Sequence, residues 1–116
     1  MRMKYTLVNI NDIPIEQAHG GSGARQMLVT PDRLTTKNFE AMTKGYLKAG
    51  AEFDWHKHTS IDEYFLVLKG RGKFYWEDEI INYKEGDIIT IPANSRHKIV
   101  ATGDVDNEFY FVRIMV

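Results

Sequence analysis

Two histidines at a spacing of two residues are the part of this chain whose residue types most directly suggest chemistry. His56 and His58 lie in a segment that is expected to form a strand. Residues two apart on a strand share one face, so the two imidazoles start roughly 6–7 Å apart along the backbone. Both nitrogens then reach a single ion at about 2.0–2.1 Å. The pair therefore indicates half of a metal site.

A carboxylate ligand is expected close by, and two acidic residues compete for the role. Glu63 is five residues from His58, and on an unbroken strand this odd spacing places Asp62, not Glu63, on the metal side. The intervening segment 59–62 has turn character, which breaks the strand and resets the alternation. Alternation alone leaves Asp62 and Glu63 both open.

Composition excludes several other kinds of site. The chain has 116 residues and no Cys, which excludes a disulfide scaffold, a thiolate nucleophile, an iron–sulfur cluster and a cysteine zinc finger. Fifteen Lys and Arg balance sixteen Asp and Glu, so no overall field attracts nucleic acid or an acidic membrane. No apolar run approaches the ~18 residues of a membrane span, and the N-terminus lacks a signal-peptide pattern. We expect one cytoplasmic domain over residues 1–116.

Short β-rich segments separated by turn signals must position the histidines. They contain many β-branched and aromatic residues, and no window has helical periodicity over a dozen residues. Close-spaced strands without helices predict a sandwich or a small barrel whose interior holds one ligand. The expected strands are Lys4–Val8, Arg25–Thr30, Asn38–Leu47, Glu52–His58, Tyr64–Lys69, Gly72–Glu77, Ile80–Tyr83, Asp87–Ile91, His97–Thr102 and Phe109–Ile114.

Residues 50–70 contain Gly50, His56, His58, Glu63 and Gly70 at the spacing G-x5-H-x-H-x4-E-x6-G. At every defined position this stretch resembles the first motif of the cupin family.

The second stretch, residues 86–101, matches the motif G-x5-P-x-G-x2-H-x3-N in part. Gly86, Pro92 and His97 are in place, whereas Asn94 replaces a glycine and Ala101 replaces the final asparagine. Asn tolerates a positive φ better than other non-glycine residues, so the first departure is mild. The second departure changes a residue that is not a ligand.

The resemblance implies an all-β fold, the double-stranded β-helix or jelly-roll barrel of a single-domain cupin. It also implies that His56, His58, Glu63 and His97 bind one divalent metal ion per chain. Imidazole and carboxylate suit Fe, Mn, Ni, Zn or Cu, and no separate organic cofactor is implied. A six-coordinate ion with four protein ligands keeps two positions for a bidentate oxygen ligand. A closed tetrahedral zinc of structural type is the alternative.

Other polar residues are weaker candidates for the site. Lys44 and Tyr46 share a face of their strand, and if that face is inward they transfer protons or anchor a carboxylate. The alternative places Lys44 and Glu40 in a solvent-facing pair. His19, beside the glycine-rich loop at 19–23, is expected to be a solvated histidine or to lie at the pocket mouth. Arg25 and Gln26 are further interior candidates.

Three classes of function are compatible with these residues and with the resemblance to cupins. The first is a metal-dependent enzyme, of oxygenase or of isomerase or lyase type, acting on a small oxygen-rich metabolite. The second is a non-catalytic module that binds a small ligand or metal, and the third is a storage protein. Small cupins are commonly dimers, and the apolar segment Tyr5–Ile10 could add a strand to a partner's sheet edge, so a homodimer is expected.

Overall fold

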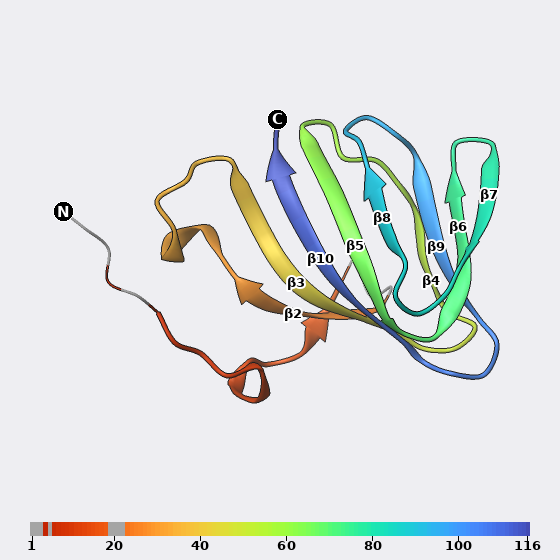
Figure 1. Cartoon of the computed structure of the whole chain (residues 1–116), viewed down its shortest axis with the longest axis horizontal. Helices are drawn as coiled ribbons and strands as arrows, with labels where there is room; N and C mark the ends of the chain where they lie inside the picture. The colour runs from red at the N-terminus through yellow and green to blue at the C-terminus, as the bar shows by residue number, and fades with distance from the viewer. Residues whose placement is uncertain (1–3, 5, 19–22) are drawn as a thin grey trace.

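The computed structural model describes residue 4, residues 6–18 and residues 23–116, and it forms two antiparallel sheets that face each other (Figure 1). The larger sheet has the order β1-β2-β3-β10-β5-β8, and the smaller has the order β4-β9-β6-β7. This is the all-β barrel that the sequence predicts. The strands are β1 (Glu16–Gln17), β2 (Ala24–Val29), β3 (Phe39–Leu47), β4 (Glu52–His56), β5 (Ile61–Lys69), β6 (Arg71–Trp76), β7 (Glu79–Tyr83), β8 (Ile88–Ile91), β9 (His97–Thr102) and β10 (Asn107–Met115).

The N-terminal prediction was wrong. No strand forms over the described residues of Lys4–Val8, and the short 3-10 helices are η1 (Ile10–Asp12) and η3 (Pro31–Arg33). The alternation of apolar residues at this end matched a strand, but no neighbouring strand in the described part of the chain supplies a partner for it. The first strand is instead the two-residue β1, which pairs with β2.

Aromatic side chains from both sheets fill the interior. Along β10, alternate residues Phe109 and Phe111 face inward, opposite Val67 and Phe65 of β5. Phe53 of β4 and Phe74 of β6 meet them from the other sheet, with ring centroids 5.9–6.3 Å apart. Such tilted and edge-on contacts are the favourable arrangements for aromatic pairs. This phenylalanine cluster holds the two sheets together.

Tight turns carry the chain between the sheets. Gly70 alone joins β5 of the larger sheet to β6 of the smaller one, at a φ of 87°. A Cβ there would collide with the side-chain amide of Asn107, so only glycine fits. Asn94, which stands where the second cupin motif has glycine, adopts a φ of 69°. The expectation that Asn would tolerate this turn is confirmed.

None of the helices in the described residues has the length and apolar character needed to cross a membrane.

Candidate metal centre

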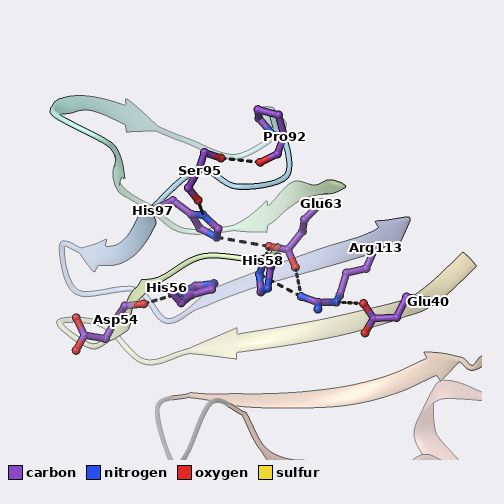
Figure 2. Close-up of polar contacts among 9 residues, drawn as sticks. All are labelled: Glu40, Asp54, His56, His58, Glu63, Pro92, Ser95, His97 and Arg113. Carbon is purple, nitrogen blue, oxygen red and sulfur yellow. Dashed lines mark hydrogen bonds and ion pairs between the residues drawn. The ribbon is translucent and has the colours of Figure 1, made fainter. Parts of the chain in front are cut away.

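The four expected ligands lie together. One ligand atom from each of His56, His58, Glu63 and His97 lies within 4.8 Å of the others, so this group could hold a metal ion. Figure 2 shows the three imidazoles and the carboxylate converging from separate segments. The ring centroids of His56 and His97 are 4.2 Å apart, and those of His56 and His58 are 4.9 Å apart. We refer to these four residues as the histidine cluster.

The two neighbouring histidines reach the cluster by a different route from the one expected. β4 ends at His56, and His58 lies in the loop that follows. Phe53 pairs with Ile99 and His56 with His97, so two residues of β4 oppose one residue of β9 between these pairs. Such a bulge changes the alternation and lets His56 face inward like Phe53. Strand alternation therefore predicted correctly that His56 and His58 lie close together, although the expected strand over Glu52–His58 ends at His56.

The structure distinguishes the two candidate carboxylates. The chain leaves strand conformation over 57–60 and re-enters it in β5, where Glu63 faces inward with Phe65 and Val67. Glu63 is 6% exposed, and its Oε1 lies 3.7 Å from His58 Nε2 and 3.9 Å from His97 Nε2. Asp62 instead accepts a hydrogen bond from the backbone N–H of Ala93. The carboxylate of the cluster is therefore Glu63.

Backbone carbonyls orient two of the imidazoles. His56 Nδ1 lies 2.6 Å from the carbonyl oxygen of Asp54, and His97 Nδ1 lies 3.0 Å from that of Ser95 (Figure 2). A carbonyl only accepts, so each Nδ1 carries the proton and each Nε2 carries the lone pair. The Ser95 hydroxyl in turn donates to the carbonyl of Pro92. Such outer contacts fix the ring and the tautomer of a metal-binding histidine.

Burial sets the charge of the cluster. Burial lowers the pKa of His97 to about 4, and burial also lowers the pKa of His56. Both imidazoles are therefore neutral at pH 7, the form that binds metal. Burial alone would raise the pKa of the Glu63 carboxyl, but its interactions with His58 and Arg113 outweigh that effect, and its pKa lies below the usual value.

Arg113 is the polar neighbour that the sequence analysis did not single out. Its Nη1 lies 3.0 Å from Glu63 Oε2 and 3.2 Å from His58 Nε2, and its Nε lies 2.9 Å from Glu40 Oε2. Arg113 continues the inward positions of Phe109 and Phe111 on β10, and a charged residue on a buried face needs a partner. The alternation of Phe109, Phe111 and Arg113 was therefore the feature of the sequence that could have pointed to Arg113.

A second bulge brings Glu40 to Arg113. Arg113 pairs with Ala41 and Ile114 with Phe39, so Glu40 is the extra residue of β3. The bulge turns the Glu40 side chain toward the interior, against the alternation expected for its strand. Glu40 therefore belongs to the neighbourhood of the cluster and does not pair with Lys44.

The structure does not bring Lys44 and Tyr46 to the histidines. They lie on the opposite face of β3 from its buried residues. Lys44 forms an ion pair with Glu108 at 3.0 Å, and the hydrogen bond with Glu108 raises the Lys44 pKa. The Tyr46 hydroxyl donates to Gln26 Oε1. A catalytic role for Lys44 and Tyr46 stays a prediction, and His19 lies outside the described residues.

A small cavity adjoins the histidine cluster. Its volume is about 110 Å³, and its lining includes polar groups of both sheets. Arg25, which pairs with Glu16 at 2.9 Å, reaches the cavity from β2. The polar residues among its lining are Arg25, Glu40, Thr43, His56, Glu63 and Arg113.

The donor set fits a divalent metal. His97 Nε2 is buried with no hydrogen-bond partner, although an unsatisfied buried nitrogen is costly. It faces Glu63 Oε1 at 3.9 Å, which is too long for a hydrogen bond but suits two ligands that share an ion. Imidazole nitrogen and carboxylate oxygen are ligands that first-row divalent metals accept. His56, His58, Glu63 and His97 are the residues that would hold the ion.

Comparison with known proteins identifies relatives of this chain. It is 42% identical over 66 residues to a 5-nitrosalicylic acid 1,2-dioxygenase of Bradyrhizobium sp, a match that covers 57% of this chain and 31% of that protein. It is 28% identical over 104 residues to an oxalate-binding protein of Thermotoga maritima, covering 88% and 85% of the two chains. The chain thus spans less than a third of the dioxygenase.

Solved structures share the fold. A predicted oxalate decarboxylase of Thermotoga maritima superposes with a TM-score of 0.87 at 23% identity, covering 96% of this chain and 100% of that one. The polyketide cyclase RemF of Streptomyces resistomycificus gives 0.79 at 17% identity, covering 96% and 80%. At these identities the likeness shows the fold alone. The cupin domain model matches residues 45–113, which include the whole histidine cluster, and the chain therefore belongs to the cupin family.

Proposed function

We propose that this cupin binds one divalent metal ion through His56, His58, Glu63 and His97 and acts there on a small oxygen-rich molecule. The observation that carries the proposal is the convergence of four ligand atoms within 4.8 Å, with the Nε2 of His97 buried and unpartnered. Two of the rings are already oriented by backbone carbonyls, so little reordering is needed when an ion binds.

The residues around the cluster suit a ligand-binding site better than a closed structural one. When bound, a first-row ion supplies Lewis-acid polarisation of a carbonyl or, if it is iron, redox chemistry with dioxygen. Interactions with His58 and Arg113 lower the pKa of the Glu63 carboxyl, so this group is ionised and suited to bind a cation. The cavity beside His56 and Glu63 gives a small molecule access to the same place.

The relatives support two versions of this function. One relative is named as a dioxygenase of 5-nitrosalicylic acid, which favours a metal-dependent enzyme of oxygenase type, with isomerase or lyase chemistry as the version for a redox-inert metal. Another is named as an oxalate-binding protein, which favours a non-catalytic module that holds a small ligand. Metal analysis with a turnover and oxygen-uptake screen separates them. Turnover that His56→Ala abolishes supports an enzyme, whereas ligand binding without turnover supports the module.

The ligand assignment has a direct test with a matched control. Glu63→Ala removes a carboxylate from the cluster, whereas Asp62→Asn changes the neighbouring carboxylate and keeps an oxygen for the Ala93 N–H. We expect calorimetric titration with Co²⁺ or Zn²⁺ to show more than about a tenfold loss of affinity for Glu63→Ala, because removing even an outer-shell partner of a ligand typically costs about 10- to 100-fold. Asp62→Asn is expected to bind like the unaltered chain. Equal affinities for all three proteins would contradict the assignment.

We also propose that the chain forms a homodimer in the cytoplasm. Exposed apolar side chains in the N-terminal segment support self-association, since Leu7 is 87% exposed and Val8 is 50% exposed. Sedimentation of the full chain against a chain lacking residues 1–10 tests this. A dimer that becomes a monomer on truncation supports the proposal, and a full-length monomer contradicts it.

A further inference from the structure

Arg113 connects the histidine cluster to the cavity. Its Nη1 contacts both Glu63 Oε2 and His58 Nε2, and its Nε contacts Glu40. Figure 2 shows the guanidinium between Glu63 and Glu40, next to the His58 ring. The side chain is 19% exposed and lines the cavity. Because a guanidinium carries five N–H donors, these three contacts leave two more for a ligand.

The contact between Arg113 and His58 conflicts with metal binding by His58. Arginine only donates hydrogen bonds, so His58 Nε2 must be the acceptor at 3.2 Å. An imidazole nitrogen has a single lone pair, which cannot accept from Arg113 and bind an ion at the same time. When His58 serves as a metal ligand, the Arg113 N–H that it accepted loses its partner. Because the Arg113 side chain is only 19% exposed, leaving this cationic donor without a partner is costly, and an acceptor of negative charge is the favourable replacement.

The charges around the cavity favour the same kind of ligand. Arg113 carries one positive charge against Glu40 and Glu63 at this cavity, while Arg25 is already paired with Glu16, which does not line it. A divalent ion at the histidine cluster therefore leaves an excess of one positive charge beside Arg113, and the burial of Glu63 and His97 strengthens the attraction of this site for an anion. The cavity volume of about 110 Å³ is well below the roughly 300–1,000 Å³ of pockets for drug-sized ligands. The ligand must therefore be small.

Resting on the proposed metal site, we propose that Arg113 anchors the carboxylate of a small organic acid that also meets the metal ion. Guanidinium and carboxylate match geometrically, because the planar fork donates two parallel hydrogen bonds to two oxygens. Glu40 and Glu63 hold the guanidinium at both sides, so its position is fixed before a ligand arrives. Metal binding, by taking the lone pair of His58, makes Arg113 available to the ligand, and the two binding events are therefore coupled favourably.

The test uses the full chain loaded with Co²⁺ and glycolate as the probe, with neutral glycolamide as the matched ligand at constant ionic strength. Glycolate is titrated against the visible Co²⁺ spectrum of four proteins: the unaltered chain, Arg113→Gln, Arg113→Lys and the control Arg25→Gln. Arg25→Gln makes the same charge change at the same cavity, at a residue paired with exposed Glu16. Co²⁺ affinity is measured separately for each protein by calorimetry.

We expect Arg113→Gln to weaken glycolate binding by roughly 10- to 100-fold, the loss of charge-assisted hydrogen bonds. Arg113→Lys is expected to recover part of that affinity, and Arg25→Gln to change it less than about threefold because an exposed charge contributes little. Glycolamide should bind weakly to all four. Co²⁺ affinity of Arg113→Gln should stay equal or rise, because His58 and Glu63 are released from Arg113. A merely structural role for Arg113 would lower metal affinity instead.

Three results would overturn the inference and are distinct from failure of the metal site. They are equal glycolate affinity in the unaltered chain and Arg113→Gln, a larger loss in Arg25→Gln than in Arg113→Gln, and a loss of Co²⁺ affinity in both Arg113 variants. Failure of the unaltered chain to bind Co²⁺ would instead overturn the proposed metal site, and this inference with it.

Discussion

Two strands, β5 and β10, contribute residues to both the apolar core and the polar site. On β5 the inward residues are Val67, Phe65 and then Glu63, and on β10 they are Phe109, Phe111 and then Arg113. The sheet register places these residues opposite one another in rows, so Phe65 faces Phe111 and Glu63 faces Arg113. One row further along the strands, the interior changes from an aromatic pair to an ion pair.

The boundary between the aromatic half of the interior and its polar half, which holds the histidine cluster, is sharp. His97 is 0% exposed and stacks on Phe74 of the core, with ring centroids 6.2 Å apart, while its Nε2 faces Glu63 on the other side. The aromatic half supplies the rigidity, and the polar half places unsatisfied and charged groups on that rigid support. We therefore expect that substitutions in the core lower stability without changing which residues form the site, and that substitutions in the site leave the core folded.

The largest expected effect comes from the aromatic half. Phe65→Ala removes a fully buried ring at the centre of the core and is expected to lower the free energy of unfolding by about 3–5 kcal/mol. Urea denaturation measures the change. Tyr64→Ala, on the outer face of the same strand and 40% exposed, is the control and should cost far less. Similar losses for the two variants would mean that the core is not where the strand register places it.

The pH dependence of stability reports on the polar half. Burial places the pKa of His97 in the folded chain at about 4, below the ordinary 6.5 of the unfolded chain. The unfolded state therefore binds the proton first, and stability that is complete above pH 6.5 falls as pH drops toward 4, by roughly 3 kcal/mol. Urea denaturation of metal-free protein with a chelator, from pH 7 to pH 4, measures the fall. His97→Gln lacks this titration and should show a shallower fall, so parallel curves would contradict the buried neutral imidazole.

Metal binding in the polar half is expected to stabilise the whole fold, and metal removal is expected to reverse this. A ligand that binds only the folded chain stabilises it by about 2.7 kcal/mol at a hundred times its dissociation constant. Adding Zn²⁺ at that excess is expected to raise the unfolding midpoint, and a chelator should reverse the change. His56→Ala should show little response to Zn²⁺ although its aromatic core is intact. An equal rise in His56→Ala would place the ion elsewhere.

The smallest effect is expected outside the barrel interior. Lys44→Met breaks the ion pair with Glu108 on the outer face of β3 and should change stability by less than about 1 kcal/mol. It should leave Co²⁺ affinity unchanged, because Lys44 does not line the cavity beside the cluster. A marked loss of turnover or metal affinity in Lys44→Met would restore the catalytic role that the sequence suggested.

Much of the site was predictable because its spacing is local. The positions of His56, His58, Glu63 and His97 follow from two short motifs. The motif, and not strand alternation, selected Glu63 over Asp62, because the turn expected at 59–62 left both residues open and the strand is in fact interrupted at 57–60. Most strands were predicted within a few residues because their β-branched and aromatic residues alternate between turn signals.

The rest depends on long-range pairing that one sequence does not express. The bulges at β4 and β3 depend on how these strands pair with β9 and β10, and they decide where His56 and Glu40 point. Arg113 meets Glu63 across fifty residues of chain, through the register of β5 and β10. Lys4–Val8 had a strand-like pattern without a strand beside it in the described chain. Local propensity fixes which residues alternate, and pairing fixes where they point.

The most direct test of the account is a crystal structure of the chain loaded with Co²⁺, with the ion located by its anomalous scattering. The account predicts one anomalous peak per chain, bonded at about 2.0–2.2 Å to nitrogens of His56, His58 and His97 and to an oxygen of Glu63. A peak at another place, or no peak among these four side chains at saturating Co²⁺, would contradict it.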